Sequence, residues 1–213
     1  MSKMRYYLLL LASFTAVFVW SATAPRDRLT WLMEVTPVVI GIVLVFATHR
    51  RFEFSRVAYA AMWAHALILM VGGHYTYAEV PLFNWLRDTY DLGRNHYDRI
   101  GHFAQGFFPA IIVREILLRT SPLKRGGWLF FIVLCVCLAI SAFYELTEWW
   151  AALMWGGAAD AFLATQGDVW DTQWDMFLAL CGALVSLAVL RRVHDRSLAV
   201  LDRTWQQMRR RRV

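Results

Sequence analysis

The chain has 213 residues, of which 59% are hydrophobic and only 18% are charged. Soluble domains carry nearer one quarter charged residues, so the composition excludes an ordinary soluble enzyme and indicates a membrane protein. The net charge of +6 does not indicate a nucleic-acid binder, because the basic residues lie in short loops and a tail between apolar runs, as membrane topology signals do.

The apolar runs are separated by short polar segments, which predicts an all-α fold: a polytopic membrane bundle of six transmembrane helices in a single domain. The first run follows Lys3 and Arg5 and could pass for a cleaved secretory signal, but Pro25 directly after its end favours an uncleaved span. The expected spans cover about residues 7–24, 31–48, 57–73, 100–118, 128–150 and 174–190, and residues 191–213 form a basic tail.

The longest loop covers residues 72–99 and contains paired glycines, Pro81 and several aromatic residues. Aromatic side chains gather at membrane–water interfaces, so this composition favours an interfacial segment or a short re-entrant helix over a free linker. We expect the loop to cover the polar residues described below.

Lysine and arginine are unequally distributed between the two sides of the predicted bundle. Sixteen lie on the side of the N-terminus, including eight tail arginines, five lie on the other side, and Arg114 lies within a span. This asymmetry predicts that both termini are cytoplasmic. Twelve of the sixteen acids lie in or near the loops of the outer side. The expected partners of the chain are membrane lipids, with the tail touching anionic headgroups.

Three short polar ladders occur near the outer ends of the fourth, fifth and sixth spans. Residues three or four apart share one face of a helix. Glu145 follows Trp128 by 17 residues, about 26 Å of helix at 1.5 Å per residue, which nearly crosses a hydrocarbon core of about 30 Å. The inner ends offer mainly Arg114 and Glu115. The ladders are Asp98, His102 and Gln105; Ser141, Glu145 and Glu148; and Asp168, Asp171 and Asp175.

So many carboxylates cannot all stay ionised side by side away from water, so some must be protonated, paired with Arg99 or neutralised by a metal ion. An oxygen-rich set with one histidine suits Mg, Ca or Mn, or a mixed zinc or iron site. A carboxylate beside a histidine can equally serve as a general acid or base. The candidate catalytic residues are Asp98, His102, Glu145, Glu148, Asp168, Asp171 and Asp175, and the candidate ligands of a divalent metal are His102, Glu148, Asp171 and Asp175.

Three classes of function fit these residues. The first is an enzyme that acts at the outer leaflet on a small-molecule or lipid-linked envelope precursor. The second is a cation- or proton-coupled transporter, which should carry polar groups through both leaflets. The third is a structural or assembly protein, in which acids complement helix dipoles and small residues such as Gly182 and Ser186 allow close helix packing.

The motifs of the second half resemble the YjdF family of bacterial inner-membrane proteins, most densely from about residue 95 to 190. This resemblance implies location and topology rather than a chemistry. A looser likeness to VanZ-like membrane proteins, which have lysine where this chain has Arg99, hints at cell-envelope work. The matching motifs are Tyr97-Asp98-Arg99-x-x-His102-Phe103-x-x-Gly106, Arg114-Glu115-x-x-x-Arg119, Ser141-Ala142-x-Tyr144-Glu145-x-x-Glu148-Trp149 and Thr165-Gln166-Gly167-Asp168-x-Trp170-Asp171-x-Gln173-x-Asp175-Met176.

Overall fold

The structure is a computed structural model that describes residues 2–210, with side chains described for 2–157 and 162–203. Over this part of the chain it is helical and contains no strand, which confirms the all-α prediction. The helices are α1 Lys3–Ala22, α2 Arg28–Thr48, α3 Arg56–Tyr75, α4 Pro81–Tyr90, α5 Tyr97–Thr120, α6 Gly127–Trp155, α7 Asp160–Leu163, α8 Asp171–Val189 and α9 Arg191–Arg210, with 3-10 turns at Tyr77–Glu79 and Gly156–Ala159.

Polar side chains fix where the first three long helices begin. Ser2, Asp27 and Ser55 precede α1, α2 and α3, and each accepts a hydrogen bond from a backbone N–H in the first turn of its helix. An N-cap of this kind satisfies one of the amides that have no partner within the helix. The start of each helix therefore follows from the sequence to within a few residues of the predicted spans.

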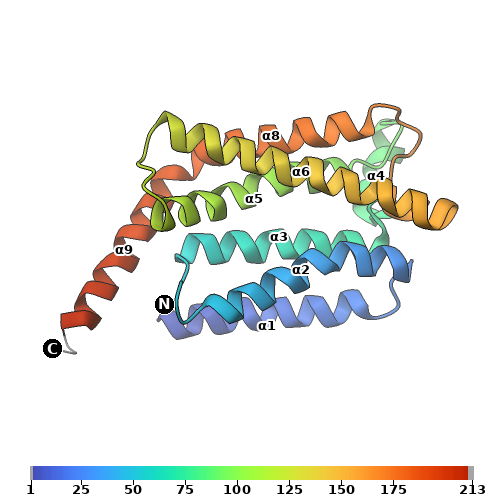
Figure 1. The fold of residues 1–213 in the computed structure, drawn as a ribbon. Helices are drawn as coiled ribbons and strands as arrows, with labels where there is room; N and C mark the ends of the chain where they lie inside the picture. The colour runs from blue at the N-terminus through green and yellow to red at the C-terminus, as the bar shows by residue number, and fades with distance from the viewer. Residues whose placement is uncertain (1, 211–213) are drawn as a thin grey trace.

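The long helices form two groups of three (Figure 1). α1 and α2 pack on α3, while α6 and α8 pack on α5 and on each other. The contact of α3 with α5 joins the two groups, so α5 lies in the middle of the molecule. Polar residues on α5 are thereby covered by neighbouring helices.

Among the described residues, five helices are long and apolar enough to cross a membrane: α1, α2, α3, α6 and α8. The fourth predicted span, 100–118, is the central part of α5, which is not among the five. α5 carries Asp98 and Arg99 at its start and Arg114, Glu115 and Arg119 near its end. These charged side chains make α5 less apolar than those five helices, and Arg114 and Glu115 are buried in the bundle.

The closest helix contact in the bundle joins α5 and α8. A methyl group added at Gly106 would overlap the carbonyl of Ala179, and one added at Gly182 would overlap the carbonyl of Phe103. The two backbones therefore touch directly, as small residues permit between membrane helices. This confirms the predicted role of the small residues of α8 in close packing.

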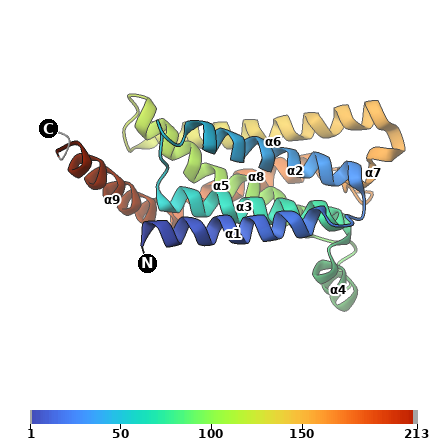
Figure 2. The ribbon, with the colours of Figure 1, turned by 90° about the horizontal axis from the view of Figure 1, so that it is seen from below.

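The remaining helices lie at the ends of the bundle. α4 has no buried residue and projects from the bundle (Figure 2). α9 starts directly after α8 and leads away from the same end at which α1 starts (Figures 1 and 2). Its first turns pack on the bundle through His194, Leu198 and Leu201, whereas the side chains of the tail arginines Arg209–Arg212 lie outside the described residues.

Candidate functional site

The predicted polar ladders meet at one end of the bundle. α5 and α8 begin there and α6 is in its last third. We call the assembled group the His102 cluster. Arg94 and Asp168 lie in loops, and the other members come from helices. Most of the members are buried. The members are Glu34, Arg94, Asp98, Arg99, His102, Glu145, Glu148, Asp168, Asp171 and Asp175.

The contact between α5 and α8 brings the side chains of these two helices close together in the cluster. His102 precedes Gly106 by one helical turn, and Asp175 precedes Ala179 by one turn. Because Gly106 and Ala179 touch, the turns above them are held close together. Asp175 is only 1% exposed, and its Oδ2 lies 3.8 Å from Nε2 of His102.

Two loops are clasped together beside the cluster. The side chain of Gln166 accepts a hydrogen bond from the backbone N–H of Asn95 at 2.8 Å and donates one to its carbonyl at 2.9 Å. Asn95 in turn accepts from the N–H of Tyr97 at 3.0 Å, in the first turn of α5. The loop before α8 is therefore fixed to the loop before α5, which brings the aspartates of one to the arginines of the other.

Two arginines form the polar partners of the aspartates. Arg99 donates to Asp168 at 2.9 Å, to Asp171 at 2.8 Å and to Asp175 at 2.5 Å. Arg94 donates to Asp171 at 2.8 Å and more weakly to Asp98 at 3.4 Å. We call these four aspartates the aspartate side of the cluster. Each of these aspartates pairs with at least one of the two arginines, and hydrogen bonds to charged groups are the stronger kind.

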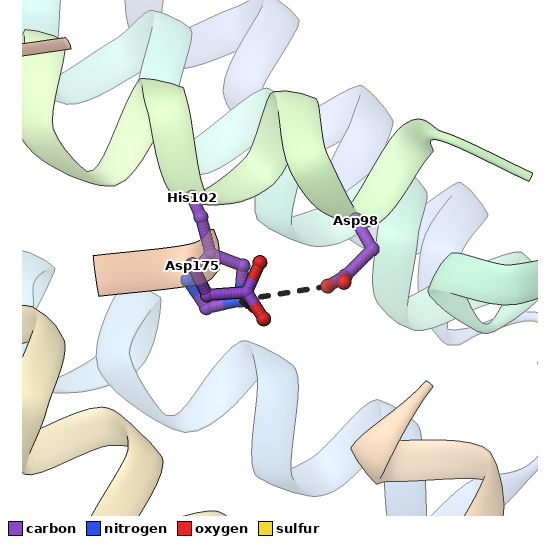
Figure 3. A group of neighbouring side chains, drawn as sticks. All are labelled: Asp98, His102 and Asp175. Atoms are coloured by element: carbon purple, nitrogen blue, oxygen red, sulfur yellow. Dashed lines mark ion pairs between the residues drawn. The ribbon is translucent and has the colours of Figure 1, made fainter. Parts of the chain in front are cut away.

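His102 stands between the aspartates and the glutamates. Figure 3 shows its ring with Asp98 and Asp175 nearby, and the dashed line marks the ion pair of His102 with Asp98. Nε2 is 3.5 Å from Asp98, while Nδ1 is 3.2 Å from Oε1 of Gln105 and 3.8 Å from Oε1 of Glu145. None of these distances is as short as a good hydrogen bond of about 2.9 Å, so the ring is loosely held.

Glu145 and Glu148 make up the glutamate side of the cluster. They are 7% and 9% exposed, and neither forms an ion pair with an arginine among the described residues. Oε1 of Glu145 is buried without a hydrogen-bond partner in the described part of the chain. An unsatisfied buried oxygen costs free energy, so this side of the cluster is the place where a cation would be stabilised.

A further buried acid was missed from the sequence. Glu34 lies on α2, is 3% exposed, and accepts a hydrogen bond from the hydroxyl of Tyr144 at 2.8 Å. The sequence does contain a signal for it, because Glu34 is a lone carboxylate inside an apolar span and such a group needs a partner. Arg94 was also missed as the second arginine of the cluster, although it stands four residues before Asp98.

The loop of residues 72–99 touches the cluster only in part. The ring of Tyr77 packs against Gly72 and Gly101, and burial raises the pKa of its phenol well above the ordinary value, so it stays neutral. Arg94 reaches the aspartates from the end of the same loop. α4, in contrast, projects away from the bundle. The expectation that the whole loop covers the polar residues therefore does not hold for α4.

The donor set fits a divalent cation in two overlapping ways. Asp98, His102 and Asp175 each offer a ligand atom within 4.8 Å of the others, and so do His102, Glu145 and Glu148. Of the predicted ligands, His102 belongs to both groups, while Asp171 belongs to neither and hydrogen-bonds both arginines.

The opposite end of the bundle contains a second buried polar group, which the sequence had not indicated. We call it the His194 cluster. Arg114 donates to Nδ1 of His194 at 2.8 Å, so Nε2 carries the hydrogen that is donated to Glu115 at 2.9 Å. Its members are Glu53, Ser55, Arg114, Glu115, Arg119, Arg125, His194 and Asp195.

Each acceptor of this second cluster is used. Glu115 is fully buried and also accepts from the N–H of Ser55 at 2.8 Å and from Arg119 at 2.9 Å. Burial alone would raise the pKa of Asp195, but hydrogen bonds from Arg114 and Arg125 outweigh it and lower that pKa. The expectation that the inner ends offer mainly Arg114 and Glu115 was wrong, because further polar groups come from the tail and from the loop before α3.

Comparisons with known proteins agree with this architecture. A family model described as "Predicted membrane protein (DUF2238)" matches residues 6–196, so the match extends well before the region of dense motifs. The chain is 50% identical to the inner membrane protein YjdF of Escherichia coli (strain K12) over 186 residues, which cover 87% of this chain and 89% of that protein. No solved structure matches. The predicted resemblance is confirmed, and the chain therefore belongs to the DUF2238 family of multi-pass membrane proteins of the bacterial inner membrane.

Proposed function

We propose that this protein is a membrane-embedded enzyme that acts at the outer face of the inner membrane on a lipid or lipid-linked envelope precursor. The His102 cluster would supply its chemistry, with the acids and His102 serving as acid and base or as ligands of a metal. The observation that carries the proposal is the uneven pairing of charge. Both arginines are engaged with aspartates, while Glu145 and Glu148 face His102 without one.

A purely structural cluster would favour complete pairing, because a buried charge without a partner destabilises the folded protein. The His194 cluster has that complete pairing, so the chain is able to build it. Glu145 instead keeps an oxygen without a partner in the described structure. Buried polar groups that destabilise the folded protein and gather at one place are candidates for function rather than stability.

A transporter is the second candidate, and the middle of the bundle weighs against it. Between the two polar clusters, α5 and α8 touch backbone to backbone at Gly106 and Gly182. Below this contact the core is apolar, with Ala110, Val133 and Ala183 each 0% exposed. A path for ions between the clusters would have to separate these helices.

We also propose six spans, with α5 as the sixth and both termini in the cytoplasm. The basic asymmetry supports this orientation, as does the start of α1 at the end of the bundle from which α9 leaves. Reporter fusions after Leu118 and after Arg192 should both report cytoplasm, and a fusion at Asp160 should report the outer side. An extracytoplasmic signal after Leu118 would contradict the proposal that α5 crosses the membrane.

The function can be tested with two isosteric variants that each remove one charge, Glu148→Gln and Asp171→Asn. A strain lacking the gene should change in its lipids or lipid-linked precursors, as measured by mass spectrometry of envelope extracts. The wild-type gene should restore the pattern, and both variants should fail at normal protein levels. Asp88→Asn, on exposed α4, is the matched control and should restore it fully. Full restoration by both cluster variants would contradict the proposal.

A further inference from the structure

The two sides of the His102 cluster differ in the partners that they already have. On the aspartate side, Asp171 receives 2.8 Å hydrogen bonds from both Arg94 and Arg99. A cation placed there would face two guanidinium groups at close range. Like charges at close range repel strongly in a partly buried site, where water screens them less than in bulk solution. The aspartate side is therefore a poor place for a metal.

The glutamate side differs because no arginine pairs with its carboxylates among the described residues. His102, Glu145 and Glu148 bring ligand atoms within 4.8 Å of one another. Glu145 is more than nine-tenths buried, and its unpartnered Oε1 faces Nδ1 of His102 at 3.8 Å. Ser141, one turn before Glu145, also has a fully buried hydroxyl without a hydrogen-bond partner in the described structure. Two buried side-chain oxygens one turn apart on α6 are therefore without a hydrogen-bond partner in the described structure.

The second nitrogen of the histidine completes the arrangement. Nε2 of His102 lies 3.5 Å from Asp98, on the side of the ring away from Glu145. Metal-binding histidines usually donate their other N–H to a carboxylate, which fixes the ring and makes the ligating nitrogen more basic. Asp98 is placed to accept that hydrogen. Without a metal, Oε1 of Gln105 accepts a hydrogen bond from Nδ1 at 3.2 Å, and a metal on Nδ1 would replace that hydrogen.

We propose that the protein binds one divalent transition-metal ion, of the Mn²⁺ or Zn²⁺ class, through Nδ1 of His102 and the carboxylates of Glu145 and Glu148, with Asp98 orienting the ring. One nitrogen and two carboxylates are the mixed ligands that such ions accept. This assignment deepens the proposed function and rests on it only for the use of the metal. Of the expected ligands it keeps His102 and Glu148 and replaces Asp171 and Asp175 by Glu145, which makes the arginine-bound aspartates a positioning group.

The test is metal binding by the full-length protein in detergent. The protein is stripped with a chelator, and free Mn²⁺ is followed by electron paramagnetic resonance during a titration, with bound Zn²⁺ measured by mass spectrometry after desalting. The wild type should bind one equivalent. Glu145→Gln and Glu148→Gln, which keep side-chain shape, should each weaken binding at least tenfold. Asp98→Asn should weaken it about 10- to 100-fold, as expected for the partner of a ligating histidine.

Two further variants make the assignment specific. Asp171→Asn should change the affinity less than threefold, and Asp88→Asn on exposed α4 should not change it. The assignment is overturned if the wild type binds no metal, or if Asp171→Asn loses as much affinity as Glu148→Gln. If the wild type binds no metal but Glu148→Gln still fails to restore the envelope pattern, the metal assignment is wrong and the proposed enzyme would act by acid–base catalysis. Metal binding with full restoration by Glu148→Gln would instead contradict the enzyme.

Discussion

The two histidine clusters are built from similar residues and are paired in different ways. Both nitrogens of His194 make hydrogen bonds below 3 Å, to Arg114 and Glu115. The shortest polar contact of His102 in the described structure is 3.2 Å, and three carboxylates surround it at 3.5 to 3.8 Å. A group whose partners are all engaged has no capacity for a ligand, whereas loosely surrounded acids retain it. Pairing, more than residue content, separates a structural cluster from a candidate site.

The largest effect is expected when the complete network is broken. Glu115→Gln removes the charge that Arg119 and the Ser55 amide contact, and leaves the largely covered Arg119 without its counter-ion. Breaking such a pair costs about 3–5 kcal/mol, which would lower the midpoint of thermal unfolding in detergent by roughly 10 °C. Asp88→Asn is the control. An unchanged midpoint would mean that the His194 cluster does not stabilise the fold.

The next effect concerns the backbone contact that holds the His102 cluster in place. Gly106→Ala puts a methyl group into the carbonyl of Ala179, so α5 and α8 must separate. Overpacking of this kind costs about 1–3 kcal/mol. Gly41→Ala is the matched control, because it meets no atom within 4 Å and should stabilise α2 by about 0.5–1 kcal/mol. Thermal unfolding of both variants checks this, and equal midpoints would argue against a tight contact.

A smaller effect is expected where charge is in excess. Glu148→Gln removes one of several neighbouring carboxylates and no arginine pair, so the free energy of unfolding should stay within about 1 kcal/mol of the wild type or rise. The measurement is the same thermal unfolding, in metal-free buffer. A loss as large as that of Glu115→Gln would make the two clusters equivalent and remove the comparison.

The smallest effect should come from acid pH. Asp195 has a folded pKa below its ordinary value of 3.8, because Arg114 and Arg125 bind its charged form. A lowered folded pKa adds stability above the unfolded pKa, and this is lost as the pH falls through the folded value. Since Asp195 is one-third exposed, the loss should be below about 1 kcal/mol, appear only below about pH 4 and be absent in Asp195→Asn. Unfolding midpoints of the two proteins from pH 6 to pH 3 should therefore converge.

The helices and their polar faces could be predicted because the signals are local. Apolar runs, N-cap residues such as Asp27 and Ser55, and spacings of three and four residues each depend on one segment. The three ladders were expected to converge because span lengths give their depth. The close packing of α8 was likewise visible as small residues one turn apart.

What could not be predicted depends on contacts between distant segments. His194 lies in a stretch that reads as a basic tail, and only folding brings it to Glu115, 79 residues earlier. The clasp of Gln166 on Asn95 joins residues 71 apart. The pairing of Arg94 and Arg99 with the aspartates, which distinguishes the two sides of the cluster, also depends on this geometry. Sequence therefore identified the acids but not which of them lack a cation.

The contact of α5 with α8 also has a mechanical consequence. Because Gly106 and Gly182 let the two backbones touch, these helices should tilt together as a rigid body when the membrane thins or is stretched. α6 also packs on α5 and α8, but a methyl group added at its glycine, Gly127, would meet no atom within 4 Å. A change in bilayer tension would then leave the spacing of His102 and Asp175 unchanged and move Glu145 and Glu148 relative to them. The glutamates would be the part of the cluster that responds to the state of the membrane.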